Sequence, residues 1–210
     1  EMPDCKSSML VVSWFGSDLR CGDCDVAPKV EQAETDGDVM PWVVSGQGRA
    51  TAGTVPMLQD RPVYGGTPAD SAVIEAIVDM RDRGIDPVFY PFILMEQMPD
   101  NALVDPWTGD AGQPKLPWRG RITTSLAPLV AGSPDGTTVA EAEVDAFMGT
   151  AAVGDFAIVD GAVTYSGPSQ WRYRRFILHY AHLCVAAGGV SAFCIGSEMR
   201  GLTQIRGAGG

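Results

Sequence analysis

The chain has 210 residues, of which 45% are hydrophobic, and this composition excludes a disordered polymer and is typical of a folded domain. With 15 Lys and Arg against 26 Asp and Glu, the formal net charge of -11 argues against nucleic acid as a partner, because phosphates would be repelled. No apolar stretch reaches the roughly 18 to 20 residues of a membrane-spanning helix, so membrane insertion is not expected.

The amino end, Glu1–Leu10, has neither a charged start nor an apolar middle, and residue 1 is not an initiator Met. A signal peptide is therefore not expected. The simplest interpretation is an internal fragment of a larger protein, in which residues 1–210 form part of one domain.

Met9–Phe15 is a short run of β-forming residues followed directly by glycine, and it predicts a first strand. The polar stretch Ser17–Asp60 predicts a long excursion with at most a hairpin and a helical turn. Within it, Cys21 and Cys24 have the spacing of a metal or redox motif.

No second Cys/His pair with ligand spacing accompanies these two cysteines. The two histidines, His179 and His182, lie on a predicted outer helix, where surface or interhelix hydrogen bonding is the default. We therefore expect no metal and no other cofactor, and we interpret Cys21 and Cys24 as incidental.

Pro62–Gly66 predicts a second short strand, and Thr67 with Pro68 gives the capping signal of a helix that Gly84 ends. Pro87–Met95 follows as a third strand. Because it is almost continuously apolar, we expect it to be a parallel strand covered on both faces.

Glu96–Gly136 is rich in proline and predicts a long loop. A capping box at Thr138–Glu141 opens a short helix that Gly149 ends. Asp160-Gly161 lies between two short β-forming runs, which is a hairpin signal. Together these features predict an insertion over about residues 96–167.

Pro168–Ala187 carries an apolar stripe at helical spacing, and Val190–Ile195 predicts a fourth strand after it. This βαβ order is compatible with a doubly wound sheet or a (β/α) barrel. Gly16-Ser17-Asp18 lacks the glycine-rich phosphate loop of the former. We therefore predict an α/β fold, the amino-terminal half of a TIM-like barrel with strands 1–4.

Glu198 follows the fourth strand, where barrels place their chemistry. Glycoside cleavage needs a carboxyl group as proton donor, and Glu198 is the candidate, with the Ser197 hydroxyl able to orient it. In the alternative, Glu198 only caps the strand and pairs with Arg200 or with an arginine from the insertion. No second carboxylate of suitable placement stands out among Asp18, Glu96, Asp105 and Asp110.

Five aromatic side chains lie at predicted strand ends or in the loops beyond them, where their rings could stack on sugars. They are Trp14, Tyr64, Tyr90, Trp107 and Trp118. Core packing explains Trp14 and Tyr90 equally well, so Trp107 and Trp118 are the better candidates for contact.

These segments resemble a known family. The matching stretches are VVSWFGSDLRCG, RPVYGGTPADSAVIEAI, FYPFILM, PWRGRIT and YRRFILHYAHLCVAAGGVSAFCIGSEMRGLTQIR. The chain resembles the glycoside-hydrolase-like TIM-barrel domain of the megatron-type baseplate protein at the tail tip of gene transfer agents and related siphophages of alphaproteobacteria.

The resemblance implies a component of a phage-like particle, assembled in the bacterial cytoplasm and released, whose partners are other tail proteins and the host-surface polysaccharide or peptidoglycan. It implies an acid/base role for Glu198 in retaining cleavage of envelope glycan. The partner nucleophile of such barrels follows the seventh strand, beyond this sequence. An inactive structural or glycan-binding tail module is the alternative.

Overall fold

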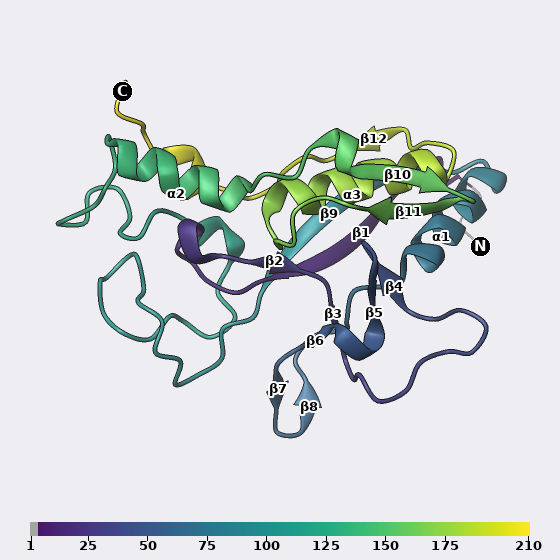
Figure 1. The fold of residues 1–210 in the computed structure, drawn as a ribbon, viewed down its shortest axis with the longest axis horizontal. Coiled ribbons are helices and arrows are strands. Elements are labelled where there is room, and N and C mark those ends of the chain that lie inside the picture. Colours follow the sequence, from purple (N-terminus) through teal and green to yellow (C-terminus); the bar gives the residue numbers. More distant parts are fainter. Residues whose placement is uncertain (1–3) are drawn as a thin grey trace.

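A long pair of parallel strands forms the centre of the fold, which is a computed structural model that describes residues 4–210 (Figure 1). Strand β1 (Ser7–Gly16) pairs with β9 (Asp86–Met95) over the whole length of both. The short β12 (Ala192–Phe193) continues the sheet in parallel beside β9, and β2 (Val26–Ala27) lies antiparallel to β1. The sheet order is β12-β9-β1-β2.

The predicted half barrel is wrong as a fold class. The described residues form this open four-stranded sheet, four two-stranded sheets and three α-helices, with no closed barrel among them. The expected second strand, Pro62–Gly66, has no place in the main sheet, because β1 and β9 occupy adjacent positions from Ser7↔Asp86 to Gly16↔Met95. Its first residue instead ends β8 (Arg61–Pro62), which forms a hairpin with β7 (Met57–Leu58).

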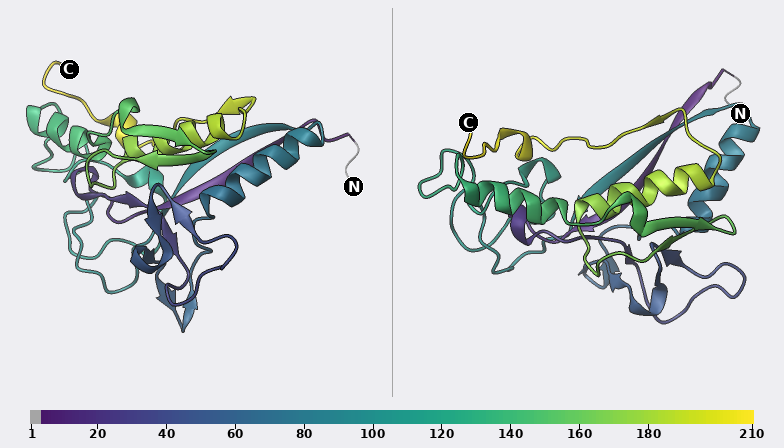
Figure 2. Two further views of the ribbon diagram at one scale, coloured as in Figure 1. Left: turned by 45° about the vertical axis from the view of Figure 1, so that its right-hand side comes forward. Right: turned by 45° about the horizontal axis from the view of Figure 1, so that its top comes forward.

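Two helices cover one face of the sheet, α1 (Asp70–Asp82) and α3 (Tyr173–Ala186) (Figure 2). Trp14 of β1 is fully buried beneath α3 and donates a hydrogen bond from Nε1 to the Tyr180 hydroxyl at 2.8 Å. Ile77 of α1 and Phe89 of β9 are also fully buried in this core. Burial of such large apolar groups supplies most of the stabilisation here.

The opposite face of the sheet is more open than expected. Along β9 fully buried residues alternate with half-buried ones, so the prediction that both faces of this strand are covered is wrong. On β1, Met9 and Val11 are 53% and 48% exposed. Both α1 and α3 pack on the other face, and therefore only loops approach this one.

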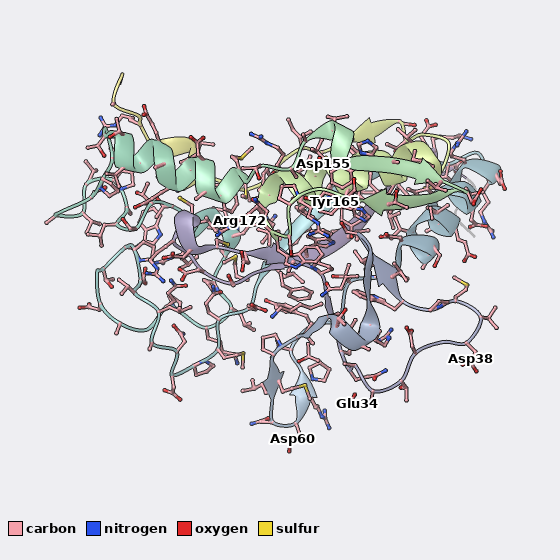
Figure 3. The ribbon with its side chains drawn as sticks, viewed as in Figure 1. Glu34, Asp38, Asp60, Asp155, Tyr165 and Arg172 are labelled. Carbon is pink, nitrogen blue, oxygen red and sulfur yellow. The ribbon has the colours of Figure 1, made fainter. Side chains whose placement is uncertain are left out.

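The excursion after β1 contains more regular structure than the sequence predicts. Its elements are short and pair locally, as β3 with β6 and as the hairpin of β4 and β5. Their bounds are η1 (Cys21–Asp23), β3 (Lys29–Val30), β4 (Val43–Val44), β5 (Gln47–Gly48), η2 (Arg49–Thr51) and β6 (Gly53–Thr54). Figure 3 shows the acidic side chains Glu34, Asp38 and Asp60 on its exposed loops.

The predicted helix and hairpin of the insertion are both confirmed. Helix α2 (Thr138–Met148) is capped by the Thr137 hydroxyl, one residue earlier than the capping box suggested. The hairpin of β10 (Phe156–Val159) and β11 (Ala162–Tyr165) turns through Asp160 and Gly161, which both have positive φ. The remaining 3-10 turns are η3 (Arg119–Arg121), η4 (Val153–Asp155) and η5 (Leu202–Gln204).

The predicted fourth strand is much shorter than expected, since only Ala192 and Phe193 pair with β9. The chain then runs on to Glu198 without further sheet pairing. Among residues 4–210, no helix combines the length and the apolarity that crossing a membrane would require.

Candidate functional site

Glu198 belongs to a connected group of side chains, here called the Arg119 cluster (Tyr90, Trp118, Arg119, Ser197 and Glu198). The Arg119 guanidinium forms an ion pair with the Glu198 carboxylate and donates to the Ser197 carbonyl at 3.1 Å and to the Tyr90 hydroxyl at 3.0 Å. The Trp118 indole Nε1 donates to Glu198 Oε2 at 3.1 Å, and the Tyr90 hydroxyl donates to Ser197 Oγ.

The cluster sits on the open face of the sheet, near the carboxyl end of β9. The Arg119 guanidinium lies 3.5 Å from the centre of the Phe92 ring, a cation–π contact, and the Arg119 side chain is only 5% exposed. Glu198 is 52% exposed and has a positive φ of 55°. The alternative in which Glu198 pairs with an arginine from the insertion is therefore what the structure shows.

Glycines allow the chain to approach itself closely here. A Cβ at Gly120 would lie 2.4 Å from the Trp118 ring, so the indole rests directly on the Gly120 backbone. The Gly201 amide donates to the Gly120 carbonyl at 2.8 Å, and a Cβ at Gly201 would lie 2.3 Å from the Ile122 carbonyl oxygen. These contacts join the segment after Glu198 to the insertion.

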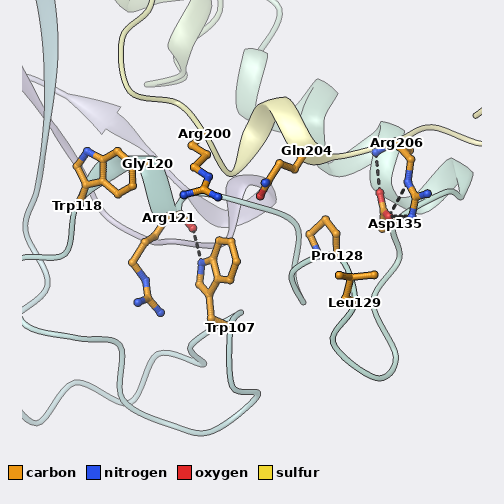
Figure 4. Close-up of a pocket in the computed structure, with 10 residues that line it drawn as sticks. All are labelled: Trp107, Trp118, Gly120, Arg121, Pro128, Leu129, Asp135, Arg200, Gln204 and Arg206. Atoms are coloured by element: carbon orange, nitrogen blue, oxygen red, sulfur yellow. Dashed lines mark hydrogen bonds and ion pairs between the residues drawn. The ribbon is translucent and has the colours of Figure 1, made fainter.

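An open groove of about 740 Å³ lies beside the cluster (Figure 4). The insertion contributes Trp107 and Trp118 to its lining, and the segment after Glu198 contributes Arg200 and Arg206. The Trp107 indole Nε1 donates to the Arg121 carbonyl at 2.8 Å, which fixes the orientation of the ring. The Trp118 side chain is 46% exposed.

The structure brings together five of the seven residues that the sequence singles out. Tyr90, Trp118, Ser197 and Glu198 are in the Arg119 cluster, and Trp107 lines the adjoining groove with Trp118. Trp14 is fully buried, as its core-packing alternative requires. Tyr64 lies elsewhere, with its ring centre 6.1 Å from that of Phe15.

The other acids of this region are mostly engaged or exposed. Asp18 is buried and accepts hydrogen bonds from Arg20 and from the Gln113 amide, the latter at 2.6 Å. Glu96 pairs with Lys29, and Asp105 lies 3.3 Å from the Arg121 guanidinium. Asp110 is exposed on its loop.

The two features set aside in the sequence are structural. His179 is buried and its Nε2 lies 2.9 Å from Asp70 Oδ1 of α1, which confirms interhelix hydrogen bonding. Cys21 and Cys24 are buried free thiols, and burial raises the pKa of each to about 12. Within the described part of the chain, no three His, Cys, Asp or Glu side chains gather as metal ligands would.

The sequence alone does not single out Arg119. An arginine in a proline-rich loop is ordinarily a solvated surface residue, and only the fold places it over Phe92. The signal that could have found it is the run Pro117-Trp-Arg-Gly-Arg121, in which glycine lets the aromatic and basic groups pack closely.

Comparison with known proteins relates the carboxyl-terminal part of the chain to a class of particle-associated domain. Residues 171–210, which include α3 and Glu198, match the family model described as the GTA TIM-barrel-like domain. The match supports the gene transfer agent TIM domain family and indicates a gene-transfer-agent-related protein, a component of such a particle. No curated protein matches the chain.

Proposed function

We propose that this chain is a tail-tip component of a gene transfer agent particle, and that the groove holds glycan of the recipient cell envelope without cleaving it. The observation that carries the proposal is the pair of indoles, Trp107 and Trp118, in one open groove. Indole faces stack on the CH groups of sugar rings, and each of these rings is oriented by a hydrogen bond from its Nε1.

The state of Glu198 favours binding over cleavage. Its Oε2 is already the acceptor of the Trp118 N–H and the partner of Arg119. Retaining cleavage needs two carboxyl groups about 5 Å apart, one to protonate the leaving oxygen and one to attack. Among the described residues that line the groove, Asp135 is the sole carboxylate, and it pairs with Arg206.

Co-sedimentation with peptidoglycan sacculi and with purified surface polysaccharide from an alphaproteobacterial recipient tests the proposal. We expect Trp107→Ala and Trp118→Ala to reduce binding about tenfold each, the equivalent of about 1.4 kcal/mol of stacking. Leu129→Ala is the matched control, because Leu129 lines the same groove, is 98% exposed and has no ring.

The same samples separate binding from cleavage. We expect no release of reducing ends from either polymer, and Glu198→Gln should still bind. Release of reducing ends that disappears with Glu198→Gln would establish the hydrolase alternative. Wild-type binding that survives both tryptophan substitutions would remove the groove from the proposal.

A further inference from the structure

The geometry points to an acidic glycan as the ligand of this groove, one whose sugar units carry carboxylate groups. This inference rests on the proposed function, since it specifies which class of glycan the groove selects. Its basis is the charge of the lining, which is opposite in sign to that of the chain as a whole.

Three arginines and one carboxylate line the groove, in a chain whose formal net charge is -11. The carboxylate, Asp135, is matched by Arg206, which donates to it from the guanidinium and from the backbone amide. Arg121 and Arg200 therefore leave an excess of positive charge in the groove. Basic groups collected in a concave site on an acidic protein attract anions and concentrate them there.

Arg200 is the arginine best placed to bind such an anion. Its side chain is exposed, and within the described residues it forms no ion pair and no side-chain hydrogen bond. In Figure 4 its guanidinium lies between the Trp118 and Trp107 rings. The planar guanidinium matches the two oxygens of a carboxylate and binds them with two parallel hydrogen bonds.

Arg121 is only partly satisfied by the protein. Its Nη2 lies 3.3 and 3.5 Å from the two Asp105 oxygens, which is long for a charge-assisted hydrogen bond. Its Nε is buried and has no partner. The guanidinium carbon lies 5.6 Å from the centre of the Trp107 ring, so a sugar stacked on that ring would bring a carboxylate near this cation.

The combination of rings and cations separates sugar classes. The two indoles offer stacking surface to any pyranose, charged or neutral. Arg200 and Arg121 add attraction only for a sugar that carries a negative group, because a neutral hydroxyl gains much less from a guanidinium than a carboxylate does. Selectivity for acidic units therefore depends on the arginines, while binding as such depends on the tryptophans.

Calorimetric titration of the chain with two matched probes tests this division. The probes are an oligogalacturonate hexamer and the same hexamer with its carboxyl groups reduced to hydroxymethyl groups. We expect the acidic hexamer to bind about tenfold more tightly, in line with one charge-assisted pair, and to lose that advantage at high salt. Arg200→Gln should abolish the preference and retain binding of the reduced hexamer.

Arg174→Gln is the matched control, since Arg174 is an exposed arginine on α3 that does not line the groove. It should bind both hexamers as the unaltered chain does. Equal affinity for the two hexamers, binding of envelope glycan but of neither hexamer, or a preference that persists in Arg200→Gln would overturn the inference alone. Preference for a sulfated hexamer over the carboxylated one would also overturn it. Failure to bind any glycan would overturn the proposed function.

Discussion

Arg119 and Glu198 form an ion pair whose partners differ sharply in exposure, 5% for the Arg119 side chain and 52% for that of Glu198. Removing the buried partner should cost far more stability. We expect Arg119→Gln to lower the free energy of unfolding by about 2 to 3 kcal/mol, because the Ser197 carbonyl and the Tyr90 hydroxyl also lose their donor.

Glu198→Gln serves as the comparison and should cost less than about 1 kcal/mol, as is usual for an exposed partner. Urea unfolding of the two variants measures both values. Equal losses would mean that the pair is held from the Glu198 side and that the cluster is organised differently.

Gly120→Ala should disable the groove and leave the core folded. The added methyl group would overlap the Trp118 indole, which must then move from its place beside Glu198. We expect glycan binding to fall about tenfold, corresponding to about 1.4 kcal/mol, and the Trp118 indole N–H resonance to shift. Gly154→Ala is the control, because nothing lies within contact distance of a Cβ there. Normal binding by Gly120→Ala would argue against a role for the Trp118 ring.

Asp70 should be the most sensitive carboxylate of α1. It accepts hydrogen bonds from the Ser45 amide at 3.1 Å and lies 2.9 Å from His179 Nε2, and all three residues are buried. Asp70→Ala leaves both groups without their partner, and we expect a loss of about 3 kcal/mol in unfolding free energy.

Asp79→Ala on the same helix changes an exposed i,i+4 pair with Arg83 and should leave the unfolding midpoint unchanged. Thermal or urea unfolding of both variants provides the test. Similar midpoints for the two would show that α1 and α3 are held together by apolar packing alone.

Alkaline pH should destabilise the fold through its buried thiols. Burial raises the pKa of Cys21, Cys24 and Cys184 to about 12, whereas a thiol of an unfolded chain titrates near 8.5. Between these values the unfolded chain releases protons that the folded chain keeps. The stability is therefore complete below about pH 8.5 and declines as the pH rises toward 12.

Urea unfolding in reducing buffer at neutral and at alkaline pH measures this decline. Cys184→Ala should make it shallower, and Cys5→Ala, at a partly exposed position, should not. An identical slope in the two variants would contradict the assignment to buried thiols.

Local signals in the sequence predicted local structure well. The hairpin at Asp160-Gly161, the helix that Gly149 ends and the pairing of His179 with another helix are all determined by short-range pattern or by burial. The number of strands in the sheet was not accessible in this way. The pattern of Pro62–Gly66 suits a strand, but whether it enters the sheet depends on β1 and β9 pairing directly, which is a long-range contact.

The site was predictable to the same extent. Trp107, Trp118 and Glu198 stand out because aromatic and acidic residues in loops beyond strands suggest ligand contact. Their relation to Arg119 and Arg200 did not, because an ion pair between residues in different segments leaves no periodic trace in the sequence. The short β12 shows the same limit, since its apolar run extends well beyond the two residues that pair.

The two walls of the groove come from segments far apart in the chain, joined by Gly201 to Gly120 and by Arg206 to Asp135. Closing so long a loop costs entropy before any contact repays it, which places such contacts late in folding. The strand pair and its helical cover can therefore form while the ligand surface is still incomplete. Recognition competence becomes the last property that the maturing polypeptide acquires, and it reports that the remainder has already assembled.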